Sequence, residues 1–176
     1  EILDELSHTI EGMDDTGIEK LANAIQRVNK IFVAGSGRSG LMAKAFAMRM
    51  MHVGLDPYVV GETITPSLEA DDILIISSGS GETKSLLSMA EKAKKIGATL
   101  ALVTTNPSSS IAKLADITVE IPAQAKAEGT SGKSVQPMGS LFEQAMLLIY
   151  DGLILHVMNQ KGLDSNKMYG RHANLE

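Results

Sequence analysis

The sequence contains no cysteine and no tryptophan, and it has only three phenylalanines and three tyrosines in 176 residues. Without cysteine there can be no disulfides, thiolate nucleophiles or sulfur-ligated metals. Few aromatic rings leave little surface for stacking on bases or sugar rings, so recognition must depend on hydrogen bonds and charge. The net charge of −5 argues against nucleic acid as a partner, because such proteins need a basic surface.

Long apolar runs are missing as well. The sequence has no run of 18 apolar residues, the length that a membrane-spanning helix needs, and no signal-peptide pattern at the N-terminus. We therefore expect a cytoplasmic protein without a membrane partner. The histidines are scattered without paired spacing, so the sequence suggests no metal site. The length allows one domain, expected over residues 1–176 with an N-terminal helical extension at about 1–29 and a C-terminal tail at about 162–176.

Short β-branched runs alternate with helical patterns along the chain. The five runs are residues 31–35, 56–61, 73–77, 99–104 and 117–121. Apolar spacings of three and four predict helices at 2–12, 18–29, 41–52, 83–96, 109–115 and 140–160. The alternation predicts an α/β fold with a doubly wound, five-stranded parallel sheet flanked by helices, preceded by N-terminal helices and closed by a long C-terminal helix. Ligands of such sheets bind beyond the carboxyl ends of the strands.

The first loop at that edge is glycine-rich. Residues 35–40 read GSGRSG, which matches G-x-G-x-x-G between a strand and a helix, and Glu62 follows the next strand. A dinucleotide-binding oxidoreductase would place these residues in this way. The alternative interpretation is a tight strand-to-helix turn that needs glycines.

A second loop, residues 77–83, has the sequence SSGSGET and opens the helix at 83–96. Ser78, Ser80 and Thr83 surround two glycines at the N-terminus of this helix. Hydroxyl groups, accessible backbone N–H groups and the helix dipole together favour a monophosphate. The alternative is an ordinary Ser or Thr cap with a turn, although a cap needs only one hydroxyl.

A third glycine motif, Gly132-Lys133-Ser134, lies in the long polar loop at 122–138. A nucleotide P-loop would also require glycine at position 127, which is Ala127, and a helix directly afterwards. Gln136 and Pro137 follow instead, so we do not expect a nucleoside triphosphate site.

Glu143 has two interpretations. It stands three residues after Ser140, a spacing that fits a capping box, but it also opens the apolar helix at 140–160, where it could carry protons in a covered site. That helix is apolar nearly all round, which predicts a subunit interface. His52 ends the helix at 41–52 and Arg49 lies one turn earlier, and for both residues surface or helix-dipole roles are the default.

The combination of motifs resembles a known family. The segments GSGRSG, MRMMHVG, GETITP, SGSGETKS, TTNPSSSIAKLAD, QPMGSLFEQ and RHANLE are similar to those of the 6-phospho-3-hexuloisomerases, members of the sugar isomerase (SIS) domain family. The likeness runs from about Ile31 to Glu176. It implies isomerisation of D-arabino-3-hexulose 6-phosphate to fructose 6-phosphate through a cis-enediolate, in the ribulose monophosphate pathway of formaldehyde fixation.

The resemblance also implies roles for single residues. Ser39, Ser78, Ser80 and Thr83 would bind the substrate phosphate, and Glu143 would move the proton from C2 to C3. Arg49 and His52 would supply donors to the enediolate, and His172 would reach the site of a neighbouring subunit. Members of the family are expected to be cytoplasmic homotetramers without a metal or redox cofactor, with hexulose-6-phosphate synthase as the metabolic neighbour.

Two alternatives stay open beside the oxidoreductase. One is another SIS isomerase acting on a pentose or heptose phosphate, because the loops do not identify the sugar. The other is a non-catalytic sugar-phosphate sensor, which would keep the serine loop but would not need Glu143.

Overall fold

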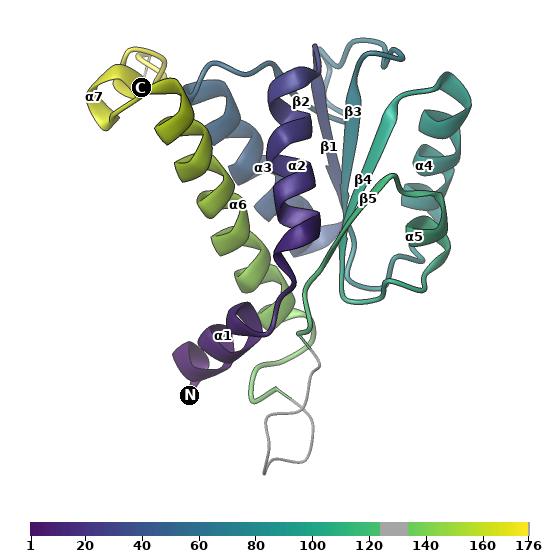
Figure 1. Cartoon of the computed structure of the whole chain (residues 1–176). Coiled ribbons are helices and arrows are strands. Elements are labelled where there is room, and N and C mark those ends of the chain that lie inside the picture. The colour runs from purple at the N-terminus through teal and green to yellow at the C-terminus, as the bar shows by residue number, and fades with distance from the viewer. Residues whose placement is uncertain (124–133, 176) are drawn as a thin grey trace.

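A five-stranded parallel sheet forms the middle of three layers (Figure 1). The computed structural model describes residues 1–123 and 134–175. The strands are β1 (Ile31–Gly35), β2 (Pro57–Val59), β3 (Ile73–Ser77), β4 (Thr99–Thr104) and β5 (Ile117–Glu120), in the order β2-β1-β3-β4-β5. The predicted sheet is confirmed. β2 is shorter than expected because it is an edge strand, and only residues 57–59 pair with β1.

Successive side chains of each strand point alternately into two hydrophobic cores, one on each face of the sheet. Ile31, Val33, Ile73 and Ile75 face α2 (Asp15–Arg27), α3 (Gly37–His52) and α6 (Ser140–Lys161). The residues between them, such as Phe32 and Leu74, face α4 (Lys84–Ile96) and α5 (Ser110–Leu114) on the other side. Because both faces are covered, the strands are apolar throughout instead of alternating with polar residues.

The remaining helices lie at opposite ends of α6 (Figure 1). α1 (Ile2–Glu11) packs beside the start of α6, and α7 (Ser165–Tyr169) follows its end. Sequence reasoning missed α7, since a helix of five residues has too few positions to show a period. It forms because Asp164 accepts the N–H of Lys167 at 2.9 Å and Met168 packs against the core.

α6 is long and apolar enough to cross a membrane by length and composition alone, with a mean hydropathy of 1.4 over 18 residues. Half of that stretch is buried inside the structure. Burial of this extent is typical of the core helix of a globular protein. Leu148 and Leu155 are exposed on its outer side.

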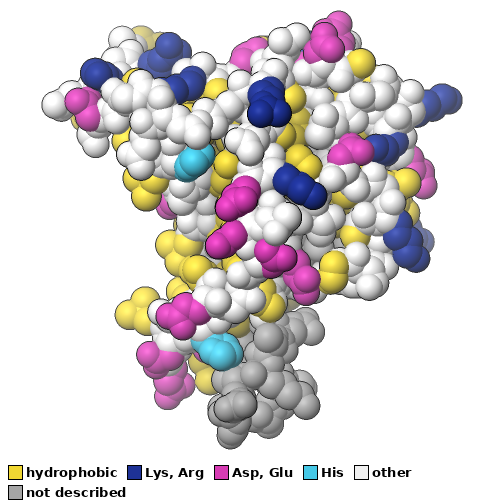
Figure 2. Space-filling model, viewed as in Figure 1, with side chains coloured by type: hydrophobic (Ala, Val, Ile, Leu, Met, Phe, Trp, Pro, Cys, Tyr) yellow, Lys and Arg dark blue, Asp and Glu magenta, His cyan; other side chains and the backbone are white. Residues whose placement is uncertain are grey.

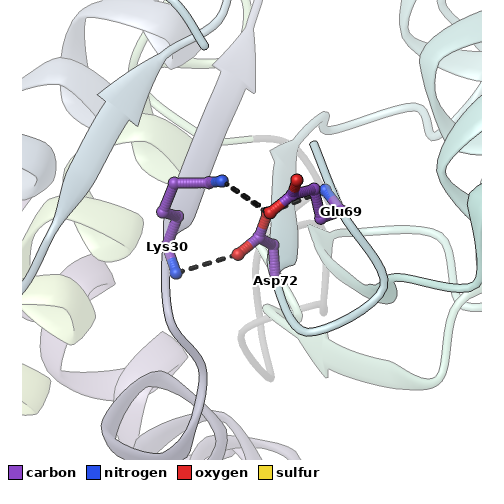
Figure 3. Close-up of polar contacts among 3 residues, drawn as sticks. All are labelled: Lys30, Glu69 and Asp72. Carbon is purple, nitrogen blue, oxygen red and sulfur yellow. Dashed lines mark hydrogen bonds and ion pairs between the residues drawn. The ribbon is translucent and has the colours of Figure 1, made fainter. Parts of the chain in front are cut away.

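An ionic cluster centred on buried Asp72 connects the amino ends of β1 and β3 (Figure 3). Asp72 is 1% exposed and accepts the backbone N–H groups of Lys30 at 3.0 Å and Glu69 at 2.7 Å. The Lys30 ammonium lies 3.4 Å from Asp72 Oδ2 and 3.2 Å from Glu69 Oε2. The cluster holds the edge of the sheet opposite to the one where ligands of this fold bind.

Candidate active site

The glycines of the first loop are required by close packing. A Cβ on Gly35 would lie 2.9 Å from the backbone nitrogen of Gly40, and a Cβ on Gly40 would lie 2.6 Å from the carbonyl oxygen of Gly35. α3 begins at Gly37, inside the motif, and not at residue 41 as expected. The tight-turn interpretation therefore accounts for the glycines, and it places half-buried Ser39 in the first turn of α3.

The serine loop, residues 77–83, follows β3 at the same edge. The hydroxyl oxygens of Ser78 and Ser80 accept the backbone N–H groups of Gly81 and Glu82 at 3.0 and 3.1 Å. A hydroxyl that accepts can still donate, so both side chains keep a donor for an anion. Thr83 is the N-cap residue of α4, but its side chain makes no capping bond. The first N–H groups of α4 are thus left without a side-chain cap, which suits an anion.

Neighbouring segments hold the serine loop rigidly. The carbonyl of Gly79 accepts from the hydroxyls of Thr104 at 3.0 Å and Thr105 at 2.7 Å. Glu82 Oε1 accepts the N–H of Ser110 at 2.7 Å, and hydrogen bonds from the side chain and backbone of Ser110 lower the pKa of Glu82. The loop is therefore shaped before any ligand arrives.

Glu143 forms an ion pair with Arg38. Arg38 Nε lies 3.1 Å from Glu143 Oε2, and Arg38 Nη1 donates to the Ser140 hydroxyl at 3.1 Å. The capping-box interpretation is wrong, because Gly139 and not Ser140 is the N-cap. The Ser140 hydroxyl and the Glu143 carboxylate, which would form the box, both contact Arg38 instead. Glu143 is 13% exposed, and its Oε2 receives no well-aligned hydrogen bond from the described residues.

Two side chains of α6, one in its first turn and one near its middle, contact the serine loop. The Phe142 ring lies 3.4 Å from the Cβ position of Gly79, and the Tyr150 hydroxyl shares a hydrogen bond of 2.6 Å with Ser77. Three segments therefore meet at the carboxyl edge of the sheet: the glycine loop with Arg38 and Ser39, the serine loop, and the first turn of α6 with Glu143.

Arg49, His52 and His172 form a second cluster. Arg49 Nη1 lies 3.1 Å from His52 Nδ1, and the His172 ring stacks on His52 and on Tyr169 with centroids 5.5 Å apart. A cavity of about 570 Å³ is lined by these residues and by Asp151 of α6. His52 is buried, which excludes the expected surface role; burial first, then the charges of Arg49 and His172, lower its pKa.

The two clusters lie at opposite ends of α3. At about 1.5 Å per residue, Ser39 and His52 are separated by roughly 20 Å along the helix. The expected enediolate site requires Arg49 and His52 close to Glu143. Within one chain, the structure does not bring Arg49, His52 or His172 to Glu143.

Sequence reasoning overlooked Arg38, Thr104 and Thr105. Arg38 lies inside the glycine motif, and its position three residues after the end of a strand was the available signal. Gly132, Lys133 and Ala127 of the rejected P-loop lie outside the described residues. Among the residues that the structure describes, no three His, Cys, Asp or Glu side chains gather as metal ligands would.

The sequence matches the SIS domain family over residues 24–148. This is more than half of the chain. The five strands and the serine loop lie inside the matched part, and the long helix α6 begins in it. The chain belongs to the SIS domain family.

Named relatives within the family are similar over the full length. A 3-hexulose-6-phosphate isomerase of Bacillus subtilis (strain 168) is 51% identical, covering 100% of this chain and 96% of the relative. That of Mycobacterium gastri is 42% identical, covering 99% and 88%. A crystal structure from Methanococcus jannaschii, described as inferring a 3-hexulose-6-phosphate isomerase function, superposes with a TM-score of 0.86 at 37% identity, covering 99% and 98%. The resemblance read from the sequence is confirmed.

Proposed function

We propose that this isomerase converts D-arabino-3-hexulose 6-phosphate to fructose 6-phosphate through a cis-enediolate, without a metal or redox cofactor. Its class, an isomerase of the SIS family, follows from the named relatives. The mechanism rests on one observation: the Arg38–Glu143 ion pair lies at the carboxyl edge of the sheet, where the serine loop also lies.

The phosphate of the substrate is held by Ser39 of the glycine loop and by Ser78, Ser80 and Thr83 of the serine loop. The hydroxyl oxygens of Ser78 and Ser80 accept backbone N–H groups of the loop itself, so their protons can be donated to phosphate oxygens. The uncapped N-terminus of α4 adds backbone N–H groups and a favourable dipole. Binding this remote group orients C2 and C3 against Glu143.

The Glu143 carboxylate is the base. It takes the proton from C2; the electrons of the C–H bond form the C2–C3 double bond, and the C3 carbonyl oxygen becomes anionic. The proton then returns to C3, the carbonyl forms at C2, and the hydroxyl proton of O2 passes to O3. No atom is gained or lost in this sequence.

Arg38 stabilises the enediolate. In the resting site its guanidinium is paired with the Glu143 carboxylate at 3.1 Å. When Glu143 accepts the proton and becomes neutral, the negative charge moves to the substrate oxygen, and the guanidinium is already in place for it. A fixed cation that needs no rearrangement is an effective form of transition-state stabilisation. We assign this role to Arg38 in place of Arg49.

Arg49, His52 and His172 contribute to the site of a neighbouring subunit in a homotetramer. Arg49 and His52 lie at the end of α3 far from Ser39, and His172 stacks on His52, which favours a role at the Glu143 of another chain over one at the Glu143 of their own chain. Apolar side chains exposed on α1 and α6 support association: Ile2, Leu3, Ile10, Leu148 and Leu155. Figure 2 shows hydrophobic side chains gathered along the side of the molecule where α6 and α1 lie.

The proposed substrate fixes the metabolic setting. The enzyme would act in the cytoplasm, in the ribulose monophosphate pathway, on the product of hexulose-6-phosphate synthase. Sugars of five or seven carbons are the remaining substrate alternatives, because the serine loop recognises the phosphate and not the chain length.

The test of this function is Glu143→Gln, which keeps the shape of the side chain and removes the base. We expect turnover of 3-hexulose 6-phosphate to fall at least about 100-fold, with the affinity for glucitol 6-phosphate retained. Glu120→Gln, an exposed acid at the end of β5, serves as the matched control. Activity of Glu143→Gln near that of the control would exclude Glu143 as the base, and wild-type protein without turnover of any ketose phosphate would favour a sensor.

A further inference from the structure

Glu5 on α1 binds the segment that leads into α6, about 130 positions away in the sequence. Its Oε1 accepts the backbone N–H of Val135 at 2.8 Å. Its Oε2 accepts the Ser134 hydroxyl at 2.8 Å and the side-chain amide of Gln136 at 3.3 Å. Both carboxylate oxygens are therefore engaged with three consecutive residues, which fixes the position of this short segment relative to α1.

Local hydrogen bonds, each spanning a few residues, hold the backbone from this contact to the first turn of α6. The Ser134 hydroxyl also accepts the backbone N–H of Gln136 at 3.0 Å, and the N–H of Ser140 donates to the carbonyl of Pro137 at 3.2 Å. The N–H of Glu143 then donates to the carbonyl of Gly139 at 3.0 Å. Fixing residues 134–136 thus fixes where α6 begins, and with it the direction of the Glu143 side chain.

The backbone between these anchors is strained. Met138 has a φ of +54°, and among the described residues it is the one non-glycine residue with a positive φ. Its side chain is fully exposed, so packing of that side chain does not hold the conformation. A side chain with a Cβ disfavours this region and persists there only where the flanking structure requires it. Glu5 on one side and the start of α6 on the other supply that constraint.

We propose that Glu5 is a positioning residue for the catalytic base: its carboxylate holds residues 134–136 so that α6 starts with Glu143 against Arg38 and the serine loop. The proposal rests on the proposed role of Glu143. Through this contact, α1, which packs against α6 and not against the sheet, would contribute to catalysis.

The expected kinetic effect is selective. A displacement of the base by about 1 Å can cost roughly 100-fold in rate, so we expect loss of the Glu5 contacts to lower kcat by about 10- to 100-fold. The serine loop is held by Thr104, Thr105 and Ser110 and not by α1. KM should therefore stay within about threefold of wild type, because phosphate binding is unchanged.

The experiment compares Glu5→Gln with Glu11→Gln in the full-length chain. Glu11 is an exposed acid on the same helix, so its substitution removes the same charge from α1 without touching residues 134–136. Steady-state kinetics with 3-hexulose 6-phosphate give kcat and KM, and circular dichroism at the assay temperature establishes the folded fraction. Ser134→Ala removes one of the contacts from the other side and leaves α1 intact, which tests the same link if Glu5→Gln does not fold.

A second comparison separates positioning from general stabilisation. In a Glu143→Gln background the base is absent, so adding Glu5→Gln should change the residual rate less than about twofold. Wild-type kcat in folded Glu5→Gln, a loss confined to KM, or an equal loss in both backgrounds would each overturn the positioning role. Full activity of Glu143→Gln itself would instead overturn the proposed function, so the two failures are distinguishable.

Discussion

Arg38→Met is the substitution that separates catalysis from folding most clearly at this site. The methionine keeps much of the aliphatic length and removes the charge, the ion pair with Glu143 and the hydrogen bond to Ser140. If the guanidinium stabilises the enediolate, its loss should lower kcat and leave substrate binding through the serine loop intact.

The structure gives different magnitudes for the two effects. Arg38 is 56% exposed, so its ion pair contributes at most about 1 kcal/mol to the free energy of unfolding. Removing one preorganised donor from a developing oxyanion costs about 100- to 1,000-fold in rate, or roughly 3–4 kcal/mol. A large loss of rate with a small change in stability is therefore expected for Arg38→Met, and Arg38→Lys should recover part of the rate because it keeps the charge.

The assay couples formation of fructose 6-phosphate to phosphoglucose isomerase and glucose-6-phosphate dehydrogenase, with substrate made enzymatically from ribulose 5-phosphate and formaldehyde. Arg27→Met, an exposed arginine at the end of α2 on the other edge of the sheet, is the control. A kcat for Arg38→Met within about threefold of this control would refute the role, as would a melting temperature lowered enough to explain the loss by unfolding.

Two further predictions concern stability. The pKa of His52 is lowered in the folded state, so unfolded chains bind more protons and the free energy of unfolding should fall as the pH drops below about 6.5; thermal melts between about pH 7 and 5 should show a flatter pH dependence in His52→Gln than in His156→Gln. Asp72→Ala removes the acceptor of the Lys30 and Glu69 backbone N–H groups and one of the two carboxylates beside the Lys30 ammonium, and it should cost about 1–3 kcal/mol in urea unfolding, whereas Asp71→Ala next to it should change little.

Local sequence patterns predicted most of the helices and strands, but few of the long-range contacts that their side chains make. The period of each helix and strand was readable, and the boundaries moved where capping decided them: α2 begins at Asp15 because Asp14 caps it, three residues before the expected start. The serine loop could be predicted because it has more hydroxyls than a helix cap needs, and Glu143 because it opens an apolar helix and matches the base of the family that the motifs resemble. Arg38 was overlooked, since its partners Ser140 and Glu143 follow more than 100 positions later.

Composition and periodicity by themselves determined the class of fold, the edge of the sheet where ligands bind, and the loop suited to a phosphate, because each depends on residues that are neighbours along the chain. Tertiary structure alone decided what Glu143 faces. Its spacing from Ser140 fitted a helix cap equally well, and the choice was made by Arg38, which the β1–α3 turn brings to the start of α6. Tertiary structure also separated Arg49 and His52 from that site, since a straight helix holds its two ends apart whatever the chemistry of its residues.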